Sequence, residues 1–102
     1  MALKNRVVIG IGLTLVVDQM LSDYCKHIHM NHTRIAEVAI KGYLKAGMPF
    51  VEVPNGRRTV RTIALPNDLI KVKDDLIEKG HVFSRIAEAA IYWFIKERKV
   101  ET

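Results

Sequence analysis

The chain has 102 residues, a hydrophobic fraction of 49% and a formal net charge of +5, with an isoelectric point near 9.6. This length suits one domain, and the hydrophobic fraction excludes a disordered chain. The basic surplus favours nucleic acid or another polyanion as a partner without defining one. Cys25 is the single cysteine. It leaves no internal disulfide, so we expect a reducing, cytoplasmic location.

The first predicted element is a strand within the apolar run VVIGIGLTLVV, which follows a basic start. Val7, Ile9, Ile11 and Leu13 alternate along this run, a pattern that predicts one buried strand face. The run also mimics a signal peptide, but it is too short to span a bilayer, and the DQMLSD that follows offers no small-residue cleavage site. We therefore expect neither a leader peptide nor a membrane span.

A helix is predicted after Thr14, because a threonine side chain suits the N-cap position. Val17, Met20 and Tyr24 recur on one side of this helix and are expected to face the core. The helix leads into a turn around His29–Asn31.

The next helix is nearly repeated later in the chain. TRIAEVAIKGYLKAG (residues 33–47) and SRIAEAAIYWFIKER (residues 84–98) share seven of fifteen aligned residues at an offset of 51. The preceding strand and helix align at an offset of 52. The first copy therefore has one extra residue, which we assign to the turn around His29–Asn31 because turns tolerate insertions.

The two copies are joined by a linker over residues 48–57, MPFVEVPNGR. Residues 50–53 are a candidate short strand in this linker, and the proline, asparagine and glycine at 54–56 predict a turn that folds it back.

The second copy begins with a strand, because RRTVRTIAL alternates with Ile63 and Leu65 on one face. Pro66 ends the strand, and NDLIKVKDDLIEKG is predicted to form a helix that Gly80 stops. HVFS predicts a tight turn before a last helix, which runs from about Arg85 onward.

A lone strand has no sheet to join, so the strand of each copy is expected to pair with that of the other. The predicted fold is a single α+β domain in which a two-stranded antiparallel ribbon lies on four helices. Its two strand-helix-helix repeats, residues 6–47 and 58–99, would be related by a pseudo-two-fold axis. The fold should then be complete in a monomer, with higher assembly left open.

The run RTIALPNDLIKVKDDLIEKG, followed by SRIAEAAIYWFIKE, resembles the ribbon-helix-helix superfamily of DNA-binding proteins over about residues 58–98. The IALPxxL start and the Ile/Ala-rich second helix carry the resemblance. Most members are homodimers of one unit, whereas this chain resembles a tandem single-chain version, similar to small proteins of archaeal filamentous viruses. The resemblance implies a regulator of transcription that binds double-stranded DNA, in the host cytoplasm if the protein is viral.

The resemblance also implies which residues would contact DNA. The ribbon would enter the major groove with its outward side chains toward the bases, and the starts of the second helices would hold phosphates. Among the central outward positions only Thr62 can read a base edge, so base readout should be weak. The outward ribbon residues are Arg6, Val8, Gly10, Gly12, Arg58, Val60, Thr62 and Ala64. The residues at the helix starts are Asn31, Thr33, Arg34, His81, Ser84 and Arg85.

A smooth ribbon face of valine, glycine and alanine also favours a different class of function. Glycines let another backbone approach closely, and an exposed ribbon offers apolar area to a peptide or protein. The alternative is therefore a protein- or peptide-binding module that uses the ribbon face and the groove between the two repeats.

Neither a metal site nor an active site is expected. The stretch CKHIHMNH holds Cys25, His27, His29 and His32, but zinc ligands usually come as two separated pairs. The acidic residues near Asp74 fall on the solvated side of their helix. The chain has no phosphate-binding glycine loop and no nucleophile beside a base, so we expect no catalysis and no cofactor.

Overall fold

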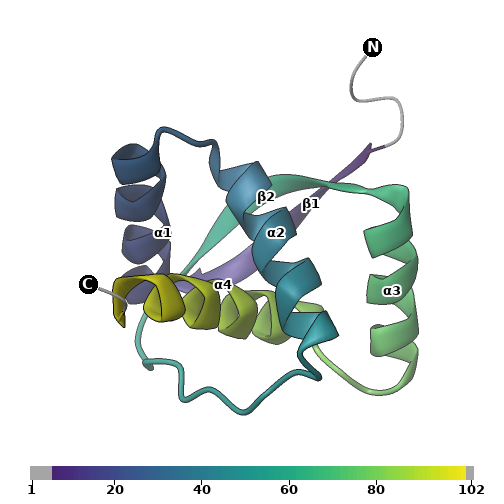
Figure 1. Ribbon diagram of the computed structural model, residues 1–102. Helices are drawn as coiled ribbons and strands as arrows, with labels where there is room; N and C mark the ends of the chain where they lie inside the picture. The colour runs from purple at the N-terminus through teal and green to yellow at the C-terminus, as the bar shows by residue number, and fades with distance from the viewer. Residues whose placement is uncertain (1–5, 101–102) are drawn as a thin grey trace.

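The computed structural model describes the backbone of residues 6–100 and the side chains of residues 6–98. Over this range the chain forms two strands and four helices, so the predicted α+β class is confirmed (Figure 1). The elements are β1 (Arg6–Thr14), α1 (Leu15–Ile28), α2 (His32–Lys45), β2 (Arg58–Pro66), α3 (Asn67–Glu78) and α4 (Phe83–Val100).

The two strands form the predicted antiparallel ribbon, with a register that runs from Arg6 opposite Pro66 to Thr14 opposite Arg58. Alternation decides which side chains are buried, because successive residues of a strand point to opposite faces. The inward residues Ile11, Leu13, Ile63 and Leu65 are at most 1% exposed. Val7, which alternation also predicts to be buried, lies at the end of the ribbon and is 40% exposed.

Helices α2 and α4 cross in front of the ribbon, and α1 and α3 stand at its two sides (Figure 1). The inward faces of α2 and α4 meet the ribbon in one hydrophobic core. Ile35 and Ala39 of α2 and Ile86 and Ala90 of α4 are all buried in this core. Burial of these residues from both helices and both strands explains why one chain can form a compact unit.

Side chains at the helix ends satisfy the backbone groups that a helix leaves unpaired. Thr14 caps α1 as predicted, its Oγ1 accepting a hydrogen bond from the backbone N–H of Val17 at 3.4 Å. Asn31 caps α2, its Oδ1 accepting from the backbone N–H groups of Thr33 at 2.8 Å and Arg34 at 3.3 Å.

Three local expectations were wrong. Residues 50–53 do not form a strand, and the whole linker lies outside the ribbon. Helix α4 begins at Phe83, two residues before the predicted start. The extra residue of the first half does not lie in the turn: the left-handed residues that end α1 and α3, His29 and Gly80, are already 51 apart. In that alignment the extra residue falls within α1. Val17 is buried as expected, Met20 and Tyr24 are partly buried against the core, and Leu21 is fully buried there as well.

Trp93 lies against Gly42, so the tryptophan occupies space that the glycine leaves open. A Cβ built on Gly42 would be 3.6 Å from Cζ3 of Trp93, an ordinary contact distance. The Trp93 ring also packs on Tyr43, with 5.7 Å between the ring centroids.

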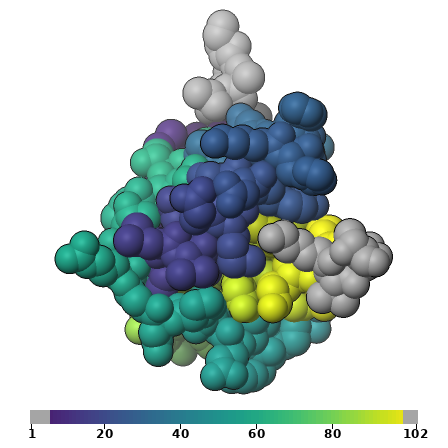
Figure 2. Space-filling view, turned by 90° about the vertical axis from the view of Figure 1, so that its left-hand side faces the viewer, coloured from purple at the N-terminus to yellow at the C-terminus, as the bar shows by residue number. Residues whose placement is uncertain are grey.

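On the face seen in Figure 2, α1 occupies the centre, with the later turns of α4 beside it and the linker below. No helix of the described part of the chain is both long and apolar enough to cross a membrane.

Candidate nucleic-acid interface

The outer face of the ribbon is open to solvent. Val8 is 61% exposed and Val60 is 71% exposed, and Gly10 and Thr62 are exposed between them. This face therefore has the accessibility that contact with DNA or with another protein requires. This surface is mainly apolar. Among its central residues, only Thr62 has a side chain that can donate a hydrogen bond.

Arg6, expected on the outer face, instead binds within the protein. Its guanidinium donates to the backbone oxygen of Ala64 at 2.8 Å and to Glu37 at 2.9 Å. Glu37 also accepts from Lys41 at 3.2 Å. Burial would raise the pKa of Glu37, but the hydrogen bonds and charges of Arg6 and Lys41 hold that pKa below its ordinary value.

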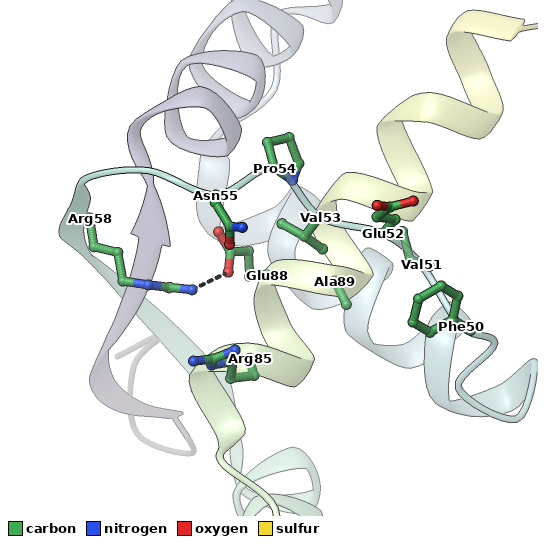
Figure 3. A pocket seen from close by; sticks show the side chains of 10 residues that line it. All are labelled: Phe50, Val51, Glu52, Val53, Pro54, Asn55, Arg58, Arg85, Glu88 and Ala89. Atoms are coloured by element: carbon green, nitrogen blue, oxygen red, sulfur yellow. Dashed lines mark hydrogen bonds and ion pairs between the residues drawn. The ribbon is translucent and has the colours of Figure 1, made fainter.

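Arg58 makes the same two kinds of contact at the other end of the ribbon. Its guanidinium donates to the backbone oxygen of Gly12 at 3.1 Å and to Glu88 at 3.0 Å (Figure 3). The Glu88 side chain is 2% exposed and also accepts the backbone N–H of Thr14 at 2.7 Å. Both ribbon arginines are therefore held by glutamates from the helices, although the family resemblance implied that they lie on the outward face that contacts DNA.

Helix side chains also occupy the outer edges of the ribbon. Ser84 Oγ accepts from the backbone N–H of Gly12 at 3.0 Å, and His32 Nε2 lies 3.0 Å from the backbone oxygen of Thr62. With Glu88 on the N–H of Thr14, these contacts cover backbone groups that a further strand would need. A peptide strand is thus disfavoured at these positions of the ribbon edges, while the open face of the ribbon is unaffected.

The contacts of Ser84 and His32 also place the starts of α4 and α2 beside the ribbon, one against each strand. Arg34 and Arg85 lie in the first turns of α2 and α4, and both are exposed. Neither forms an ion pair with any residue of the described range. Thr33 is half-buried in the first turn of α2, and His81 is exposed before α4. Of the expected phosphate contacts, the two arginines are the groups best placed to meet an anion.

Arg61 is a charged residue that the sequence analysis missed. It sits on the inward side of β2, where its guanidinium donates to Asp18 at 2.7 Å and to Ser22 at 2.8 Å on α1. The sequence offered a signal for this contact: an arginine at an inward strand position, and an acidic residue, Asp18, in the first turn of a neighbouring helix. Arg61 thus fastens α1 to the ribbon.

The cysteine and histidines near the end of α1 are not gathered around one point. Cys25 is half-buried, and burial raises the pKa of its thiol, with Arg61 partly opposing that effect. His27 and His29 are exposed, and His32 contacts the ribbon. Within the part of the chain that the structure describes, no three histidine, cysteine or acidic side chains are arranged to hold a metal ion.

Comparisons with family models, curated proteins and solved structures found no match to this chain.

Proposed function

We propose that the protein is a tandem ribbon-helix-helix protein that binds double-stranded DNA, with the open face of the ribbon toward the major groove. The observation that carries the proposal is the placement of two exposed arginines, Arg34 and Arg85, at helix starts that flank the exposed ribbon. Helix starts and guanidinium groups both attract phosphates. An intracellular regulator of transcription is the role that such binding would serve.

The contacts at the two ends of the ribbon support a pseudo-two-fold relation between residues 6–47 and 58–99. Arg6 binds the backbone oxygen of Ala64 and a glutamate of α2, while Arg58 binds that of Gly12 and a glutamate of α4. Each of these residues aligns with its counterpart at the offset found in the sequence. The register agrees, since its central pair, Gly10 and Thr62, is itself an aligned pair.

The internal contacts of Arg6 and Arg58 change the role that the family resemblance implied for these two arginines, which was contact with DNA. Since glutamates neutralise these two, they would position the ribbon, and the affinity for DNA would come chiefly from Arg34 and Arg85. Val8, Gly10 and Val60 cannot hydrogen-bond base edges through their side chains, so binding should discriminate sequences weakly.

The test is the salt dependence of binding to mixed-sequence duplex DNA, followed by fluorescence anisotropy. Each phosphate contact contributes about −0.9 to the log–log slope, so the double variant Arg34→Gln/Arg85→Gln should flatten the slope by about two contacts. The matched control is Lys45→Gln/Lys96→Gln, two exposed cations that align with each other at the far ends of α2 and α4. The proposal fails if both pairs change the slope equally, or if the natural protein has no affinity at low salt.

A second candidate is a protein-binding module that uses the ribbon face and the groove between the two repeats. The exposure of Val8 and Val60 favours it, since apolar area is useful against a protein and of little use against phosphates. Val8→Glu/Val60→Glu separates the candidates. A ribbon that faces DNA should lose DNA binding through charge repulsion, whereas unchanged DNA affinity would remove the ribbon from the DNA interface and leave its face for a protein.

A further inference from the structure

A pocket of about 320 Å³ lies between the linker and the first half of α4, beside the start of β2 (Figure 3). Its volume is at the lower end of the range for small-molecule sites. Aliphatic groups from the linker and from α4 form much of its wall. The lining residues are Phe50, Val51, Glu52, Val53, Pro54, Asn55, Arg58, Arg85, Glu88 and Ala89.

The charges that line the pocket are unequally compensated. Arg58 and Glu88 neutralise each other at 3.0 Å. Arg85 has no ion pair with any described residue, and Glu52 lies exposed at the opposite end of the pocket from Arg85 (Figure 3). The end of the pocket near Arg85 therefore has one uncompensated positive charge. The side-chain amide of Asn55, which lines the pocket beside Glu88, is a further hydrogen-bonding group.

We propose that this pocket binds a small organic monoanion, a carboxylate with a short branched apolar body. The guanidinium of Arg85 would hold the carboxylate, because guanidinium and carboxylate match as planar, two-point partners. Val53, Pro54 and Ala89 would receive the apolar body. One uncompensated cation suits a single negative charge better than the doubly charged phosphate group. The inference goes beyond DNA binding and does not depend on it.

The test is a titration of the full chain, followed by the amide signals of residues around the pocket in two-dimensional NMR. The probe is 3-methylbutanoate, and its neutral amide of the same shape is the control ligand. A ligand of this size should bind with a Kd of about 1 mM. Inorganic phosphate, which has the charge without the apolar body, should bind more weakly.

Two variants separate the pocket from general attraction to a basic surface. Arg85→Gln should weaken carboxylate binding by about tenfold or more, since it removes a charge-assisted hydrogen bond. Arg34→Gln is the matched control, because Arg34 aligns with Arg85 but does not line the pocket. Ala89→Leu should also block binding by filling the pocket, and its spectrum shows whether the fold is kept.

Several outcomes would overturn the inference. Equal weakening by Arg34→Gln and Arg85→Gln would mean that the carboxylate follows surface charge. Equal shifts with the neutral amide would remove the role of the guanidinium, and tighter binding of phosphate would make the site one for inorganic anions. If Ala89→Leu does not fold, the comparison of the two arginine variants decides.

Discussion

Replacing Glu88 with alanine should destabilise the protein more than the same change at Glu37, the aligned residue on α2. Glu88 accepts the backbone N–H of Thr14 at 2.7 Å as well as the guanidinium of Arg58 at 3.0 Å. Its side chain is 2% exposed, against 13% for Glu37. The residue aligned with Thr14 is Pro66, which has no N–H, so Glu37 cannot accept the matching bond.

The size of the difference follows from these contacts. Removing the Glu88 carboxylate leaves the N–H of Thr14 buried without an acceptor, at a cost of about 1–3 kcal/mol. Arg58 is 40% exposed and can return to water, so the lost ion pair adds at most about 1 kcal/mol. Glu37→Ala breaks only side-chain pairs, and it leaves no backbone group without a partner. Arg6 and Lys41, 29% and 49% exposed, can turn to water, so the change should cost about 1 kcal/mol or less. We therefore expect a difference of about 1–3 kcal/mol between the two variants.

The assay is urea-induced unfolding followed by circular dichroism at neutral pH, with free energies from linear extrapolation. Glu88→Gln refines the comparison, because its amide oxygen can still accept the N–H of Thr14 while the charge is lost. Its stability should fall between those of the natural protein and Glu88→Ala. Equal destabilisation by Glu88→Ala and Glu37→Ala would refute the reasoning. A glutamine variant as unstable as the alanine variant would show that the charge of Glu88, and not the backbone N–H, is what matters.

Three further outcomes are expected. Gly42→Ala should stabilise the fold by about 0.5–1 kcal/mol, because it replaces a helical glycine and its methyl group meets Trp93 at an ordinary 3.6 Å. A lower free energy of unfolding in the urea assay would mean that Trp93 cannot accommodate the methyl group. Gly10→Val should cost about 1–3 kcal/mol, because a Cβ there would lie 2.9 Å from Cγ1 of Val60. Adding Val60→Ala should recover part of that loss, and strict additivity in the double-mutant cycle would argue against the clash. The pKa of Glu37 is lower in the folded protein than its ordinary value of 4.5, so its carboxylate adds stability at pH values above 4.5. This contribution disappears as the pH falls through the lower pKa of the folded state. Glu37→Gln should thus be less stable than the natural protein at neutral pH and approach it in acid, whereas a constant gap in unfolding free energy would contradict the linkage.

Much of the local structure could be predicted from the sequence because it depends on neighbouring residues. Alternation of apolar residues predicted the two strands and the buried residues Ile11 and Ile63, and Thr14 marked the start of α1. The near-repetition of one segment led us to predict that the two strands pair with each other, since neither had another partner, and β1 and β2 do pair in antiparallel orientation. The strand expected over residues 50–53 does not form, because a turn at 54–56 can fold the linker back without supplying a neighbouring strand for it to pair with.

The candidate site depended far more on the tertiary structure. The sequence by itself determined that Arg6 and Arg58 would lie at the ends of a ribbon with a smooth outer face. Only the fold decided that glutamates from α2 and α4 would hold both guanidiniums. Arg34 and Arg85, at the helix starts beside the ribbon, are exposed and form no ion pair with any described residue. The reason is physical: the alternation of a strand and the periodicity of a helix are set by local backbone geometry, whereas the partner of a long charged side chain is set by the elements that pack beside it.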